Sequence, residues 1–210
     1  MREFWSVNGR SVLRLYINQL AMSVFGLMVI TGSAAMGGAE DNLFILLASF
    51  VSMGLYLYII YSMMWDAGAK AAAKTLRAED SGVKKTETPF YIVLFGSTIN
   101  IILYGLYAAA KITAAEVAGG MVEIIIRMTN AVYMGFEAVL FPNPNYELYI
   151  KGEQTVNTVM NTPPYYFFLT LIPLFIVGIG AYYLGASEIS IMRKLGFKHK
   201  HKPTYKTGRK

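Results

Sequence analysis

Residues 116–137 read EVAGGMVEIIIRMTNAVYMGFE, a stretch that is apolar enough for a membrane and yet carries charged side chains. On a helical projection of about 100° per residue, its charged and amide side chains share an arc of roughly 80°. The rest of the circumference is mostly Ile, Val and Met. Whether this stretch crosses a bilayer decides the number of spans. The polar stripe comprises Glu116, Glu123, Arg127, Asn130 and Glu137.

The composition of the whole chain is typical of a membrane protein. Of its 210 residues, 55% are hydrophobic and only 15% are charged, and the mean hydropathy is +0.42. Soluble domains carry about a quarter charged residues. We therefore predict an all-α integral membrane protein, a four-span transmembrane helix bundle in one domain at 1–192, followed by a basic tail at 193–210. The apolar runs that predict the spans are 12–33, 43–65, 90–110 and 165–186.

The distribution of Lys and Arg predicts the orientation, because short cytoplasmic loops are enriched in both. The segment 66–89 holds five of them and the tail holds eight, whereas the loop GGAEDN at 37–42 holds none. Both termini are therefore predicted to be cytoplasmic. The chain has no Asn-x-Ser/Thr sequon, which disfavours a glycosylated secretory protein. The predicted location is a bacterial cytoplasmic membrane.

The distribution of Lys and Arg also predicts that residues 111–141 do not cross the membrane. The span 90–110 then ends outside, and the last span alone returns the chain to the cytoplasm. Residues 142–164 are too polar to cross and form a predicted extracytoplasmic loop. Three central charges would cost about 2.5 to 3.5 kcal/mol each on insertion, and each Ile, Val or Phe returns only about 0.3 to 0.6 kcal/mol. We predict an amphipathic helix at 113–141 that is half-sunk in the outer leaflet or re-entrant, bent at Gly119-Gly120. A fifth true span is the alternative.

The polar stripe permits two interpretations. Glu123 and Arg127 stand four residues apart with the acid first, the favourable order for a helical ion pair. One interpretation is an ion or proton site completed by Asn130 and Glu137, since ionisable groups inside membranes are functional candidates. The other is a self-neutralising pair on a surface-lying helix.

Amide side chains inside the predicted spans are a second set of candidates. Such groups usually join helices by hydrogen bonds, and a substrate path is the alternative interpretation. The spacings Ala48-x-x-x-Ser52 and Ala181-x-x-x-Gly185 indicate close helix contacts. The amide candidates are Asn18, Gln19 and Asn100.

The sequence offers little for catalysis. It has no cysteine, its two histidines, His199 and His201, lie in the tail, and it contains no HExxH, GxSxG or Walker motif. We therefore predict no enzymatic activity, no cofactor and no metal. The predicted function is that of an accessory or assembly subunit of a membrane complex. The alternative is a small transporter or channel component that uses Glu123, Arg127, Asn130 and Glu137.

Clustered basic residues predict the partners. The net charge of +6 comes largely from the tail, so it indicates attraction to anionic lipid headgroups and not to nucleic acid. A membrane protein partner or a second copy of the chain is also predicted. The residues predicted to contact headgroups are Lys70, Lys74, Arg77, Arg193, Lys194, Lys198, Lys200 and Lys202.

Overall fold

The computed structural model of the chain describes residues 2–37, 42–77, 87–141 and 162–187, and in these ranges the regular elements are all helices. The all-α prediction is confirmed for this part of the chain. In order, the elements are α1 (Arg2–Gly37), α2 (Asn42–Arg77), α3 (Thr88–Gly96), α4 (Thr98–Ile112), α5 (Glu116–Thr129), the 3₁₀ turn η1 (Ala131–Tyr133), α6 (Met134–Leu140) and α7 (Pro164–Ala186).

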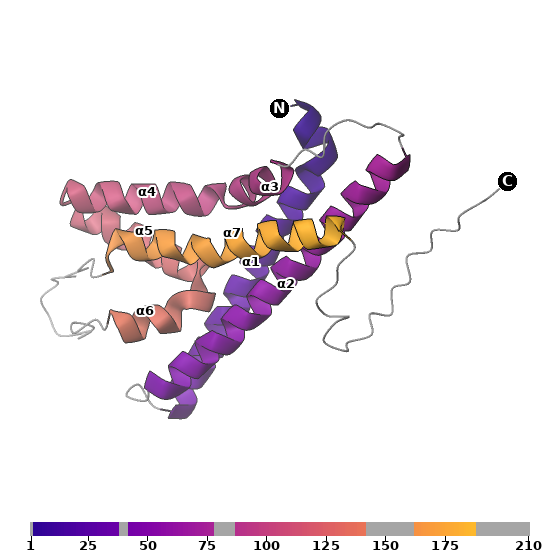
Figure 1. The fold of residues 1–210 in the computed structure, drawn as a ribbon. Coiled ribbons are helices and arrows are strands. Elements are labelled where there is room, and N and C mark those ends of the chain that lie inside the picture. Colours follow the sequence, from indigo (N-terminus) through magenta and orange to yellow (C-terminus); the bar gives the residue numbers. More distant parts are fainter. Residues whose placement is uncertain (1, 38–41, 78–86, 142–161, 188–210) are drawn as a thin grey trace, which may run out of the picture.

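Two helices of 36 residues each, α1 and α2, form an antiparallel pair that runs diagonally through Figure 1. Each is longer than its predicted span because its helix continues past the apolar run. The amide of Asn18 donates to the sulfur of Met63 at 3.6 Å across this pair. This predicted intramembrane amide therefore joins two helices.

Helix α7 makes the most extensive contact of the bundle, with α2, and the two run in the same direction. Ala181 and Gly185 are buried in that contact. The small-residue spacing had predicted a close approach there, and it is confirmed. Pro173 lies inside α7, where it removes one backbone hydrogen bond.

The third predicted span is broken into α3 and α4, which meet at an angle of 56°. Gly96 lies so close to α1 that a Cβ on it would stand 2.3 Å from a methyl of Leu15. At the break, the N–H of Ser97 donates both to Val93 at 3.0 Å and to Leu94 at 3.2 Å. The helix tightens here and changes direction, which hydropathy alone did not predict.

Residues 116–140, which we call the hairpin segment, reverse direction halfway. Helix α5 packs against α4, η1 packs on α1, and α6 packs on the first half of α2. The bend predicted at Gly119-Gly120 is wrong, because α5 continues through both glycines. The chain instead reverses beyond Thr129. Its tip fits against Gly26, where a Cβ would come 2.7 Å from the backbone nitrogen of Val132.

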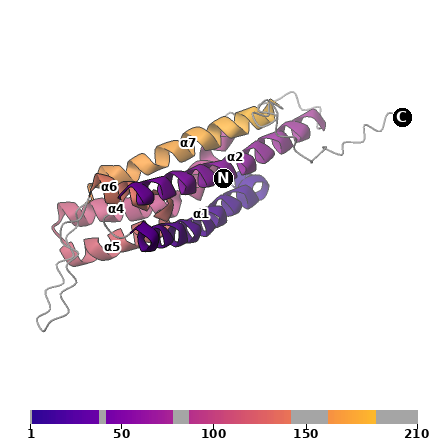
Figure 2. The ribbon, with the colours of Figure 1, turned by 90° about the horizontal axis from the view of Figure 1, so that it is seen from below.

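Three helices in the described ranges are long and apolar enough to cross a membrane, and the bent α3–α4 pair makes a fourth if it counts as one span. The start of α1 and the ends of α2 and α7 lie toward the right of Figure 1. The end of α4 and the start of α7 lie to the left, and Figure 2 shows the same arrangement from below. The three helices are Phe4–Ser33, Leu43–Ala73 and Pro164–Ala186.

Candidate functional site

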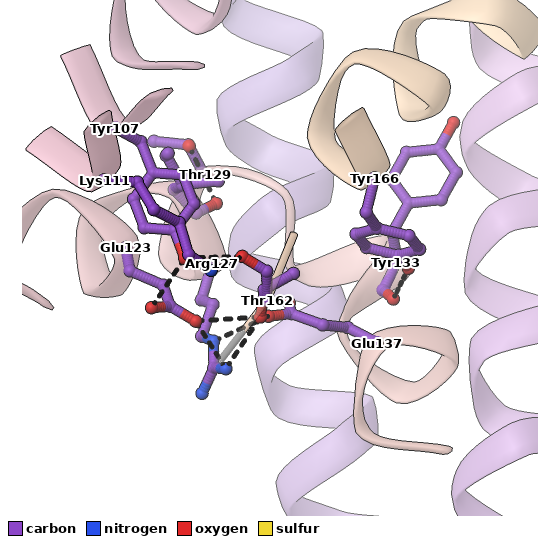
Figure 3. Close-up of polar contacts among 10 residues, drawn as sticks. Tyr107, Lys111, Glu123, Arg127, Thr129, Tyr133, Glu137, Thr162 and Tyr166 are labelled. Carbon is purple, nitrogen blue, oxygen red and sulfur yellow. Dashed lines mark hydrogen bonds and ion pairs between the residues drawn. The ribbon is translucent and has the colours of Figure 1, made fainter. Parts of the chain in front are cut away.

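Three residues of the predicted polar stripe meet in one ion-pair network (Figure 3). The Arg127 guanidinium contacts Glu123 through Nη2 and Glu137 through Nε, each at 2.8 Å. Glu123 and Arg127 are neighbours on α5, as their spacing predicted. Glu137 belongs to α6 and reaches the network because the hairpin segment folds back.

Thr162, immediately before α7, completes the network, and sequence reasoning did not identify it. Its hydroxyl oxygen lies 2.8 Å from Glu123 and 2.6 Å from Glu137, and Arg127 donates to it at 3.3 Å. A hydroxyl carries one hydrogen, so Thr162 can donate to only one of the two carboxyl groups at a time. Thr162 thereby links α7 to both arms of the hairpin segment.

Two residues from the last turns of α4 extend the network. The Tyr107 hydroxyl donates to the backbone carbonyl of Thr162 at 2.6 Å and lies 3.2 Å from a carboxyl oxygen of Glu123. The Lys111 ammonium donates to the same carbonyl at 3.0 Å and stands 5.8 Å from the Tyr107 ring centre. We call the whole set the charged clasp. It comprises Tyr107, Lys111, Glu123, Arg127, Glu137 and Thr162.

The charged clasp is buried and electrically balanced. The side chains of Glu123 and Glu137 are 7% and 5% exposed, and that of Arg127 is 16% exposed. Two acids face two bases, and each of these four residues has a hydrogen-bond partner. Arg127 contacts both buried carboxyl groups directly and supplies the positive charge that compensates them. Arg127 is therefore the residue on which the two buried carboxyl groups depend.

Helix α5 is turned the opposite way from a helix of a water-soluble protein. Its apolar residues Met121, Ile124 and Ile125 are exposed, whereas Glu123 is buried against α4. Glu123 and Arg127 of the predicted polar stripe thus face the bundle and not the outside. Such an arrangement suits an apolar surrounding, because there the bundle interior is the only polar environment.

The fourth stripe residue, Asn130, lies outside the charged clasp. Its amide donates to the hydroxyl of Tyr104, which in turn lies 3.3 Å from the hydroxyl of Thr170 on α7. Near it, the Ser23 hydroxyl of α1 donates to the backbone carbonyl of Thr129. These contacts hold the tip of the hairpin segment against α1, α4 and α7.

The other predicted amides form a contact of their own. Asn100 donates to the side-chain carbonyl of Gln19 at 3.4 Å, which joins α4 to α1. Both residues are buried. These two amides therefore join two helices by a hydrogen bond. This contact agrees with the interhelical interpretation of the amides and not with the substrate path.

The predicted headgroup contacts are described only in part. Lys70 forms an exposed ion pair with Asp66 at 2.5 Å. The side chains of Lys74, Arg77 and Glu116 lie outside what the structure describes, as does the basic tail with His199 and His201. In the described ranges, no three His, Cys, Asp or Glu residues are grouped as a metal site requires. No protein-family model, curated protein or solved structure matches this chain.

Proposed function

We propose that the chain crosses a bacterial cytoplasmic membrane four times, with both termini cytoplasmic. The crossings are α1, α2, the bent α3–α4 pair and α7. The distribution of Lys and Arg supports this orientation, with five in 66–89, eight after 191 and none in 37–42. The shared direction of α2 and α7 also supports it, because both would then run toward the cytoplasm.

In this topology the hairpin segment is re-entrant and enters from the outer side. Both of its arms contribute to the charged clasp beside the last turns of α4, and its tip packs against the middle of α1 at Gly26. The outward apolar face of α5 supports contact with lipid. Its inward charges, neutralised within the clasp, support burial in the bundle. Irregular backbone at membrane depth requires such protein cover.

We propose that the protein is a non-enzymatic accessory or assembly subunit of a membrane complex. The observation that carries this is the closed set of contacts around Arg127, which engages both carboxyl groups and Thr162. A catalytic acid or base has to reach a substrate atom. In the charged clasp these groups are used to join α4, the hairpin segment and α7, which favours a structural role.

The expected partners follow from the outer surface of the bundle. Anionic headgroups suit the basic ends, and a membrane protein or a second copy suits the apolar helix faces. One such face on α2 presents Val51, Gly54 and Leu55 to the outside. Gly54 has no neighbour that a Cβ would touch, so a partner helix can approach closely there.

Purification from native membranes in a gentle detergent tests this function. A photo-crosslinking residue at Val51 should yield a discrete covalent product with a partner or a second copy. The matched control is Leu15, which is fully buried and should yield no such product. A monodisperse monomer, with no product from Val51, Leu55 or Met121, would contradict the accessory role.

A transporter or channel component is the second candidate, favoured by the two helix breaks at Ser97 and Asn130 beside buried amides. Broken helices line the substrate sites of many transporters. In proteoliposomes, Glu123→Gln and Glu137→Gln together would then abolish the flux of an ion or small solute while the protein stays folded. Wild-type liposomes without flux of protons, cations or small metabolites would exclude this candidate for the isolated chain.

A further inference from the structure

The middle of the bundle holds a second polar group, inward of the charged clasp, which we call the central polar layer. It is connected by the Asn100–Gln19 hydrogen bond and by the contact of Asn130 with Tyr104. Tyr56 of α2 joins it, since its hydroxyl interacts with Gln19 and lies near Tyr104 and Tyr133. The layer comprises Gln19, Tyr56, Asn100, Tyr104, Asn130 and Tyr133.

Two hydrogen-bonding atoms in this layer have no partner among the described residues, namely the side-chain nitrogen of Gln19 and the hydroxyl of Tyr133. Their residues are only 6% and 7% exposed. The Gln19 nitrogen approaches the Tyr56 hydroxyl without a hydrogen bond of normal geometry. The Tyr56 and Tyr133 rings lie edge to face with centres 6.2 Å apart. Native proteins rarely bury such groups unpaired, because each loses its hydrogen bonds to water.

The chemistry of the layer identifies what would pair with them. All six side chains are neutral, so a charged ligand would lack a counter-charge there. The Gln19 nitrogen can only donate, whereas the Tyr133 hydroxyl can donate or accept. Water supplies both donors and acceptors and is small enough for a packed interior.

We propose that Gln19, Tyr56 and Tyr133 form an internal hydration site at the tip of the hairpin segment, where they bind one or two ordered water molecules. Ser97, at the α3–α4 break, is one helical turn from Asn100, and its hydroxyl also has no partner in the part of the chain that the structure describes. The site would therefore serve both breaks in the helices. The bound water would supply hydrogen bonds to buried polar groups at a depth that bulk water does not reach.

The site is closed on its cytoplasmic side in the proposed topology. Leu15, Ile60 and Val93 are fully buried there, in a core cluster that also includes two tyrosines of the layer. Toward the outer side, Tyr104 packs on Phe167 in a second buried cluster. The proposed water thus lies between two packed clusters, which sets it apart from an open channel.

Hydroxyl-radical footprinting of the intact protein in lipid nanodiscs tests the proposal, because radicals formed on ordered internal water oxidise the side chains beside it. Pulsed X-ray exposure in ¹⁸O-labelled water should oxidise Tyr56 and Tyr133 despite their burial. Tyr107 is the matched control, because it is fully buried outside the layer and its hydroxyl already donates to the carbonyl of Thr162.

A substitution at Tyr133 tests the proposal independently, by the direction in which it changes the thermal unfolding midpoint. If water occupies the site, Tyr133→Phe removes a real hydrogen bond and lowers the thermal unfolding midpoint by about 2 to 4 °C. If the hydroxyl is truly unpaired, the same change relieves an uncompensated group and raises the midpoint. A higher midpoint overturns the proposal, as does oxidation of Tyr56 and Tyr133 no greater than that of Tyr107.

Discussion

Gly68 of α2 lies directly against the backbone of Tyr182 in α7, so closely that a Cβ on Gly68 would stand 2.0 Å from the Tyr182 carbonyl oxygen. A glycine of α7 approaches the backbone of α2 in the same way. A Cβ on Gly185 would stand 2.0 Å from the carbonyl oxygen of Trp65. Both obstacles are backbone atoms, so no side-chain rotation can relieve them. This pair of glycines sets the distance between α2 and α7.

Gly68→Ala and Gly185→Ala should each destabilise the bundle by about 1 to 3 kcal/mol or more, because overpacking forces two helix backbones apart. Thermal unfolding in detergent measures the effect. Gly105→Ala and Gly180→Ala are matched controls, because nothing lies within 4 Å of a Cβ at either position. The controls should be neutral or stabilising by about 0.5 to 1 kcal/mol. Equal effects at all four positions would contradict the packing.

Arg127→Ala should destabilise the protein by about 3 to 5 kcal/mol, because it leaves two buried carboxyl groups uncompensated. The triple variant Glu123→Gln, Arg127→Met, Glu137→Gln should recover most of this loss, since no charge then remains in the centre of the clasp. Unfolding midpoints of the three proteins give the comparison. A triple variant as unstable as Arg127→Ala would show that the charges themselves are required.

Ala114 is the one non-glycine residue in the described ranges with positive φ, at 53°. It follows α4, and the N–H of Ala115 closes the helix end by donating to Ala110 at 2.9 Å. Glycine is the usual residue at this position. Ala114→Gly should stabilise the protein by about 0.5 to 1 kcal/mol. Ala109→Gly, within the exposed face of α4, is the control and should destabilise by about 1 kcal/mol.

The absence of cysteine makes the topology directly testable. A single Cys at Thr113 should react with a membrane-impermeant maleimide on intact cells, because the α4–α5 turn is proposed to face outward. A Cys at Lys70 or Lys206 should react only after permeabilisation. Labelling at Lys206 from outside would refute the four-span topology and favour a fifth crossing.

The predicted role of the basic tail is testable apart from the bundle. Residues 193–210 carry eight Lys and Arg and no acid. A soluble protein fused to them should bind anionic liposomes with about 1 kcal/mol per basic residue and release as salt screens the charge. Deleting 196–210 from the full chain should leave its unfolding midpoint unchanged. Equal binding to neutral and anionic liposomes would assign the tail another role.

Much of the helix layout followed from hydropathy. The predicted runs 12–33, 43–65 and 165–186 lie within the helices that are long and apolar enough to cross. The break at Ser97 was not predictable, because it depends on how closely Gly96 packs against Leu15 of α1. A contact between residues 81 positions apart leaves no trace in local sequence.

The helical projection names three residues of the charged clasp, Glu123, Arg127 and Glu137, but it does not give their geometry. Glu137 was placed beside Arg127 because both fall on one face of a continuous helix. In such a helix, ten residues would separate them by about 15 Å. The contact at 2.8 Å exists because the chain reverses after Thr129, where no Pro or Gly marks the turn. Thr162 was missed because its role depends entirely on where α7 begins.

The position of Thr162 in the chain has a consequence for biosynthesis. The hydroxyl that contacts Glu137 belongs to a residue made 25 positions later. When the ribosome has completed the hairpin segment, the N-terminal residues of α7 that cover its charges do not yet exist. In the proposed topology, we therefore expect the segment to stay at the membrane surface until α7 is inserted and then to move inward. A chain that ends before Thr162 would lack the hydroxyl that contacts both Glu123 and Glu137.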